Sequence, residues 1–174
     1  KHYLLYGSER YALAILRPLQ TAIRARGGRV AWFFDGPGAE ELRADETWLK
    51  STKEVRQFNP IAVLTSSNAV PHFFPAVKRE VFHGFDAGKP RHIYIRGFFD
   101  LYCTTGKRDT EAFNSKAPEL GDFAVKETGW PKLDPFMRVY GTPEPPPVRE
   151  QPVILYHSTF SPSWSAAPIL YDTI

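Results

Sequence analysis

The chain has 174 residues, 43% of them hydrophobic, and a net charge of +3 from 22 basic and 19 acidic side chains. No apolar run reaches the roughly 18 residues that a transmembrane helix needs, and no basic segment leads into an apolar run as in a signal peptide. The basic residues are dispersed, which permits an anionic ligand but argues against nucleic acid as a partner. The one cysteine, Cys103, excludes an internal disulfide and favours a reducing, cytoplasmic location.

The first third of the chain alternates between strand and helix patterns. Short apolar runs predict strands over residues 3–6, 30–34 and 61–65. Helical spacing predicts helices from about residue 9 to Gly27-Gly28 and over residues 45–58, with Ser8 as the first N-cap. Pro18 lies within the first helix and predicts a kink or a break there. Strands and helices that alternate in this way indicate βαβ units and a parallel sheet.

The middle of the chain continues this pattern with shorter elements. Strands are predicted over residues 81–82, 92–96, 101–104 and 123–126, and helices over residues 70–77, 109–117 and 132–137. The near-continuous apolar strands suit a parallel sheet that is covered on both faces. The predicted fold class is therefore α/β, with a Rossmann-like parallel sheet and helices on both faces.

A change in composition near residue 141 divides the chain. Residues 1–140 are predicted to form the Rossmann-like domain, and the proline-rich residues 141–152 an interdomain linker. Residues 153–157 then predict a new buried strand, and residue 166 begins a helix that the chain does not finish. We interpret residues 153–174 as the truncated start of a second Rossmann-like, nucleotide-binding domain, and the chain as part of a larger protein.

Several short motifs occur in a characteristic order. They are His83-Gly84, Phe99-Asp100, Thr105-Gly106, Thr128-Gly129-Trp130-Pro131-Lys132-Leu133-Asp134 and Ile154-Leu155-Tyr156-His157-Ser158-Thr159-Phe160. In this order they resemble the CDP-glycerol glycerophosphotransferases of the teichoic-acid polymerase type. The resemblance covers residues 60–174 well and the first third only by general pattern. The family often has Thr-Pro after His-Gly, whereas this chain has Phe85-Asp86.

The resemblance implies a GT-B architecture, the N-terminal half of which would bind the acceptor while the second domain holds most of the nucleotide. It implies transfer of glycerol phosphate from CDP-glycerol to a hydroxyl of a glycan or polyol-phosphate acceptor, without a cofactor or a metal ion. Lipid-linked acceptors would bring peripheral contact with the inner face of the cell membrane, and an oligomer is compatible. The alternatives are another GT-B enzyme, such as a nucleotide-sugar glycosyltransferase or a UDP-sugar 2-epimerase, and a non-catalytic flavodoxin-like binding domain.

The residues around His83 carry the expected chemistry. His83 follows a predicted strand, and ligands of open α/β sheets bind beyond the carboxyl ends of the strands. Histidine accepts protons near neutral pH, and the resemblance matches His83 to the catalytic base of the family. Gly84 would allow close approach of the substrate, Asp86 could orient the ring of His83, and Lys89 could face a phosphate. The alternatives are a structural histidine and an ordinary solvated loop.

Other polar side chains are expected at the same edge of the sheet. Ser66 and Ser67 follow the third predicted strand and would face the substrate. By resemblance, Ser158 and Thr159 would approach the phosphates of the donor; local turn hydrogen bonds are the alternative. Arg96, Lys107 and Arg108 would either add positive potential near the cleft or lie on the solvated surface. No histidine pair has zinc-site spacing and no Asp-x-Asp motif occurs, so no metal is expected.

Overall fold

A computed structural model describes residues 1–84, 93–96, 99–141, 151 and 165–170. The chain divides into two compact units, Lys1–Gly141 and Thr142–Ile174. In the second unit the described residues include one short helix, α5 (Ala167–Leu170), within the helix predicted from residue 166. The predicted strand over 153–157 and most of the predicted linker lie outside the described residues.

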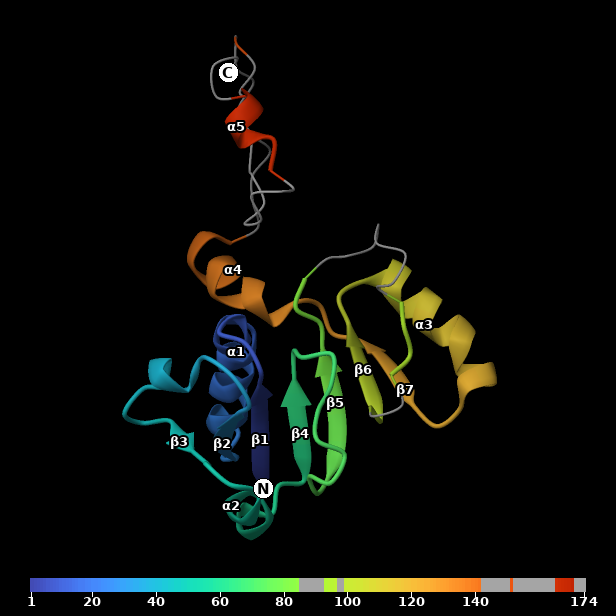
Figure 1. Ribbon diagram of the computed structural model, residues 1–174. Coiled ribbons are helices and arrows are strands. Elements are labelled where there is room, and N and C mark those ends of the chain that lie inside the picture. Colours follow the sequence, from blue (N-terminus) through green and yellow to red (C-terminus); the bar gives the residue numbers. More distant parts are fainter. Residues whose placement is uncertain (85–92, 97–98, 142–150, 152–164, 171–174) are drawn as a thin grey trace. The chain divides into compact units, whose positions relative to one another are not determined.

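The first unit is built on a parallel sheet (Figure 1). Its strands are β1 (His2–Gly7), β2 (Arg29–Phe34), β3 (Thr47–Trp48), β4 (Ala62–Thr65), β5 (Val77–Val81), β6 (Leu101–Thr104) and β7 (Ala124–Glu127). Every pairing is parallel, and the order across the sheet is β3-β2-β1-β4-β5-β6-β7. The first six strands have the order of a doubly wound Rossmann sheet, and that order reverses between β1 and β4. The predicted α/β, Rossmann-like fold class is confirmed.

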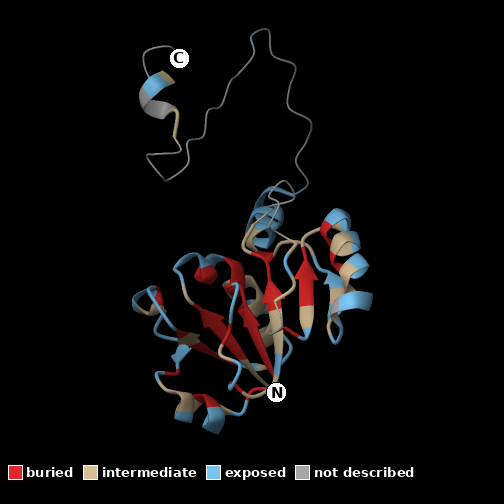
Figure 2. Cartoon of the chain, turned by 45° about the vertical axis from the view of Figure 1, so that its right-hand side comes forward, coloured by how far each residue is buried: buried red, intermediate tan, exposed pale blue. Residues whose placement is uncertain are grey.

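Helices pack on both faces of this sheet: α1 (Tyr11–Ala25) on one face, and α2 (Thr52–Phe58) and α3 (Lys107–Leu120) on the other. The unit also contains η1 (Ala39–Glu41), η2 (Pro131–Leu133) and α4 (Asp134–Tyr140), and no residue of α4 is buried. Successive strand residues point to opposite faces, so Leu5 packs with α1 while Leu4 packs in the cluster that contains Val55 of α2 and Phe113 of α3. Buried residues therefore follow the strands, while the outer faces of the helices are exposed (Figure 2).

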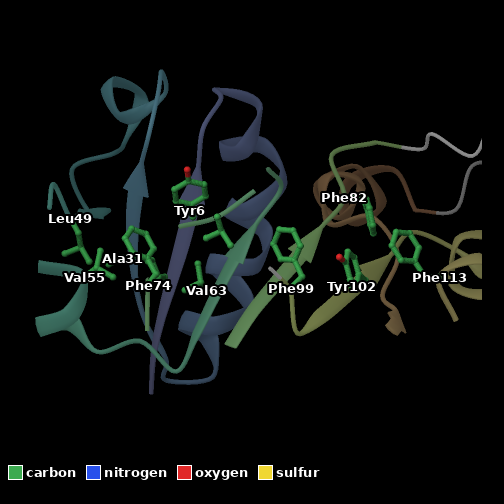
Figure 3. Close-up of a cluster of buried hydrophobic side chains, with 12 residues drawn as sticks. Tyr6, Ala31, Leu49, Val55, Val63, Phe74, Phe82, Phe99, Tyr102 and Phe113 are labelled. Atoms are coloured by element: carbon green, nitrogen blue, oxygen red, sulfur yellow. The ribbon is translucent and has the colours of Figure 1, made fainter. Parts of the chain in front are cut away.

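The cluster on the α2 and α3 side is rich in aromatic rings. Figure 3 shows it extending across the sheet from Leu49 and Val55 to Tyr102 and Phe113. The Tyr102 ring lies 4.8 Å from the Phe113 ring, centre to centre. Cys103 is buried in the cluster on the α1 side, as its apolar strand predicted. Both faces of the sheet are thus packed, which explains why its strands are nearly continuously apolar.

The helix predicted over residues 45–58 is wrong in its first half. Thr47–Trp48 forms the edge strand β3 and pairs with β2, and the helix α2 begins only at Thr52. Ser51 is the N-cap, because its side chain accepts a hydrogen bond from the backbone N–H of Glu54 at 3.3 Å. The long-range pairing of Trp48 with Trp32 overrides the local helical pattern.

Two further predictions between β4 and β6 are wrong. Residues 71–76 form turns instead of a helix, because two prolines and the positive φ of Ala76 (81°) interrupt it; β5 starts at Val77. The described part of the strand predicted over 92–96, residues 93–96, has no regular secondary structure. Ile93 and Ile95 instead pack against the aromatic cluster.

The start of α1 also differs from the prediction. The helix begins at Tyr11, with Arg10 at the N-cap position and no side-chain cap, so Ser8 is not the cap. Pro18 neither breaks nor ends the helix, which continues to Ala25. Gly27, with φ of 74°, follows the end of the helix as predicted.

Candidate functional site at the carboxyl edge of the sheet

The carboxyl ends of β1 and β4 meet where the strand order reverses. Tyr6 pairs with Thr65, so the following residues, Gly7 and Ser66, are neighbours. Beyond them, the hydroxyl oxygens of Ser8 and Ser67 lie 2.8 Å apart and share a hydrogen bond. Ligands of open α/β sheets bind at this reversal point. The serine pair therefore joins the two loops that border the expected ligand position.

The start of helix α1 adds a positive dipole end to this edge. No acidic side chain lies in the first turn of α1, and no side chain caps it. Ser66 is completely buried, and its hydroxyl oxygen has no hydrogen-bond partner among the residues that the structure describes. The positive dipole end of a helix and a buried hydroxyl without a partner among the described residues suit an anionic group such as a phosphate.

The loop after β2 holds the loop after β1 in place. The backbone N–H of Asp35 donates to the carbonyl oxygen of Gly7 at 2.9 Å. Gly36 has φ of 140°, and a Cβ atom at this position would collide with the carbonyl oxygen of Ser8. Only glycine adopts that backbone conformation readily and leaves room for the Ser8 carbonyl. Gly36 thus positions Ser8 at the edge of the sheet.

His83 joins the same edge from β5, two residues after the strand ends at Val81. The ring is half-buried, and its centre lies 5.5 Å from the ring of Tyr11, the first residue of α1. Its Nδ1 atom is buried and lacks a hydrogen-bond partner within the described part of the chain. A neutral imidazole with an unoccupied nitrogen can accept a proton from a bound hydroxyl group.

The tyrosine beside His83 stays protonated at neutral pH. Burial, with a smaller contribution from the charge of Glu9, raises the pKa of Tyr11 above its usual value. Its hydroxyl is therefore a hydrogen-bond donor rather than a base. Tyr11 was not identified from the sequence, where it reads only as the first turn of an amphipathic helix. Its contact with His83 depends on how β5 and α1 come together.

Of the residues predicted to form the site, the structure brings Ser66, Ser67 and His83 to one edge of the sheet. Gly84 is half-buried there, and a Cβ atom at this position would meet no neighbour within 4 Å among the described residues. Asp86, Lys89, Ser158 and Thr159 lie outside the described residues. Ser8, interpreted from the sequence as a cap, belongs to the site through its bond to Ser67.

Two of the three basic residues expected near the site, Lys107 and Arg96, have partners elsewhere. The exposed Lys107 lies 3.8 Å from Glu111, one turn further along α3. Arg96 lies neither at the site nor on the solvated surface, since its guanidinium is mostly buried beside Glu80. The sequence did not predict that Glu80 is buried in the sheet, because the predicted strand begins one residue later, at Val81.

No family model matches the chain, and no curated protein matches it. Within the described residues, no helix has the length and apolar character needed to cross a membrane. The same residues contain no group of three or more histidine, cysteine, aspartate or glutamate side chains arranged to hold a metal ion. The site is therefore interpreted from its own geometry.

Proposed function

We propose that the unit Lys1–Gly141 binds a phosphate-bearing acceptor at the carboxyl edge of its sheet, with His83 as the general base. The observation that carries the proposal is the buried, unpartnered Nδ1 atom of His83 beside the start of α1. Imidazole is a suitable base at neutral pH, and this edge is where α/β sheets place their ligands. The resemblance to CDP-glycerol glycerophosphotransferases supports assigning glycerol phosphate as the transferred group.

The proposed reaction is a phosphoryl-type transfer. A hydroxyl oxygen of the acceptor attacks the β-phosphorus of CDP-glycerol, and the bond from that phosphorus to the bridging oxygen breaks. CMP leaves with the electron pair of this bond, while His83 takes the proton of the attacking hydroxyl. A hydroxyl is a weak nucleophile, so a positioned base contributes on the order of 100-fold or more to the rate.

The serines and the helix start have a binding role in this proposal. Ser66, Ser8 and Ser67 supply hydroxyl groups, and the first turn of α1 supplies a positive dipole end. These groups would hold an anionic part of the acceptor close to His83. In this proposal the donor nucleotide is held mainly by a second domain, to which the resemblance assigns residues 153–174.

The decisive test measures CMP release from CDP-glycerol in the intact parent protein. His83→Ala is expected to lower the rate at least about 100-fold while the circular dichroism spectrum stays unchanged. His72→Ala is the matched control, because His72 is exposed on the loop between β4 and β5, and it is expected to keep full activity. Equal rates in the two variants would refute the role of His83.

Two binding measurements separate this proposal from its alternatives. Calorimetry with CDP-glycerol, CDP-ribitol and UDP-sugars tests the donor class, and preferential binding of a UDP-sugar would favour another GT-B activity. Binding of glycerol 3-phosphate without any turnover by the intact protein would favour a non-catalytic binding domain. Because the resemblance assigns most of the nucleotide contacts to the second domain, residues 1–141 alone are expected to release no CMP.

A further inference from the structure

Glu80 is a buried carboxyl group without hydrogen bonds, on the opposite face of the sheet from α1. It lies on β5 between Thr65 of β4 and Tyr102 of β6. Its exposed fraction is 0%, and neither of its carboxylate oxygens has a hydrogen-bond partner among the described residues. Buried carboxylates are normally paired and hydrogen-bonded, so this one needs an explanation.

A short irregular segment, residues 93–96, lies against this part of the sheet. The Arg96 guanidinium Nη1 lies 3.5 Å from Glu80 Oε1, an ion pair rather than a hydrogen bond. The Tyr102 hydroxyl donates to the Arg96 carbonyl oxygen at 2.6 Å and accepts from the Arg96 N–H at 2.8 Å. Ile93 and Ile95 pack against the aromatic cluster. The segment is therefore attached by few contacts, and two of its anchors are Glu80 and Tyr102.

The charge state of Glu80 is balanced near neutrality. Burial raises the pKa of Glu80 to about 7, and the positive charge of Arg96 opposes part of that rise. In a state in which water reaches the carboxyl group, its pKa returns towards the ordinary value of 4.5. The closed arrangement therefore binds the proton more tightly than an open one, and ionisation favours opening.

The described groups that interact with Glu80 keep their charge state in the same pH range. The charged and titratable groups that interact with it are Arg96 on the segment and Tyr102 and Cys103 on β6. Burial raises the pKa of Tyr102 to about 12 and that of Cys103 to about 11, so both stay neutral below pH 9. Among these groups of the described residues, Glu80 is therefore the one whose charge changes between pH 5 and pH 8.

We propose that Glu80 is a proton-dependent switch that controls whether residues 93–96 cover the sheet. With a neutral carboxyl group, the segment closes over β5 and β6. Loss of the proton places an unsolvated charge beneath the segment, and the segment opens to admit water to Glu80. The proposal is independent of the transferase activity, because it concerns the opposite face of the sheet from α1 and His83.

Hydrogen–deuterium exchange of the 174-residue chain tests the switch. Protection of the amides of residues 93–96, corrected for the intrinsic pH dependence of exchange, is expected to fall between pH 5 and pH 8. The fall is at most roughly 70-fold, for a pKa that drops from about 7 in the closed state to 4.5 in the open state. Glu80→Gln, which is neutral at every pH, is expected to keep full protection over this range.

Two further variants make the test specific. Glu119→Gln replaces an exposed glutamate of α3 and is expected to behave as the native chain does. Arg96→Gln removes the cation that lowers the Glu80 pKa, so the midpoint of opening is expected to move to higher pH, a result that does not depend on Glu80→Gln folding. Unchanged protection from pH 5 to pH 8 in the native chain, or the same fall in Glu80→Gln, would overturn the proposal. An unmoved midpoint in Arg96→Gln would also contradict it.

Discussion

Two buried glutamates, Glu46 before β3 and Glu80 on β5, have opposite surroundings. Glu46 accepts hydrogen bonds from Arg17 at 3.0 and 2.9 Å, from the Gln20 amide at 2.7 Å and from the Arg43 backbone N–H at 2.9 Å. Glu80 accepts none from the described residues and faces a single guanidinium. The side chain of Glu46 is 0% exposed and that of Glu80 is 1% exposed, although Glu80 lies deeper in the protein.

The two carboxyl groups consequently ionise at very different pH. Burial pushes the pKa of Glu46 upwards, but the hydrogen bonds from Arg17, Arg43 and Gln20 and the charge of Arg17 outweigh it and lower the pKa to about 2. Without hydrogen bonds to its charged form, Glu80 has a pKa raised to about 7. Hydrogen bonds to the charged form, together with depth of burial, decide at which pH a buried carboxyl group loses its proton.

The largest expected effect comes from removing the satisfied carboxylate. Glu46→Ala leaves the Arg17 guanidinium and the Gln20 amide without their partner, and Gln20 also accepts a hydrogen bond from the Trp32 indole at 2.7 Å. The free energy of unfolding, measured in urea, is expected to fall by about 3 kcal/mol. Glu119→Ala, on the exposed face of α3, is the control and is expected to leave it unchanged. A loss as small as that of the control would show that the network is not stabilising.

The pH dependence of stability tests the comparison directly. The pKa of Glu46 is lower in the folded state, so its stabilisation is present above pH 4.5 and is lost as the pH falls towards 2. The pKa of Glu80 is higher in the folded state, so its contribution is present below pH 4.5 and is lost as the pH rises to 7. The combined contribution of these two groups to the free energy of unfolding is therefore greatest near pH 4.5.

Replacing each glutamate singly by glutamine separates the rise of stability below pH 4.5 from its decline above pH 4.5. Glu80→Gln is expected to abolish the decline between pH 4.5 and 7, which amounts to at most about 3 kcal/mol. Glu46→Gln is expected to flatten the rise between pH 2 and 4.5 and to lower stability above it. Urea unfolding at a series of pH values measures both. An undiminished decline above pH 4.5 in Glu80→Gln would assign it to another group.

The sheet was predictable from the sequence, whereas its polar interior was not. Continuous apolar runs identified β1, β2, β4 and β6, because strands covered on both faces contain few polar residues. The same rule concealed β5, whose first residues, Val77–Glu80, are mostly charged and gave no strand signal. Glu80 lies on the face of the sheet against which Ile93 and Ile95 pack and beside Arg96, and local sequence patterns do not report such long-range contacts.

The site was predictable in position but not in its contacts. His83, Ser66 and Ser67 were expected at the carboxyl edge because each follows a predicted strand, and the structure brings them there. The roles of Ser8 and Tyr11 depend on the parallel pairing of β1 with β4 and on the packing of α1 beside β5. These contacts join residues far apart in sequence, and a strand or helix pattern carries no information about them.

Two glycines allow a similar comparison of steric collision with backbone strain. Gly36→Ala is expected to destabilise the fold by about 2 kcal/mol, because the residue has φ of 140° and its new Cβ atom would collide with the Ser8 carbonyl. Gly27→Ala, at φ of 74° with no neighbour within 4 Å of a Cβ atom, is the control for backbone strain alone and is expected to lose about 1 kcal/mol. Equal losses in thermal unfolding would indicate that the loop carrying Ser8 adapts freely.

The smallest expected effect on stability comes from two serines. Like the two glutamates, one of them is hydrogen-bonded and the other has no partner among the described residues. Ser67→Ala removes the hydrogen bond to Ser8 and is expected to lower the free energy of unfolding by about 1 kcal/mol. Ser66→Ala removes a buried hydroxyl that has no partner among the described residues, so stability is expected to stay the same or rise slightly. Affinity for glycerol 3-phosphate, measured by calorimetry, is nevertheless expected to fall in Ser66→Ala, because the hydroxyl is free to bind a ligand. A marked loss of stability with unchanged affinity would instead assign Ser66 to the fold.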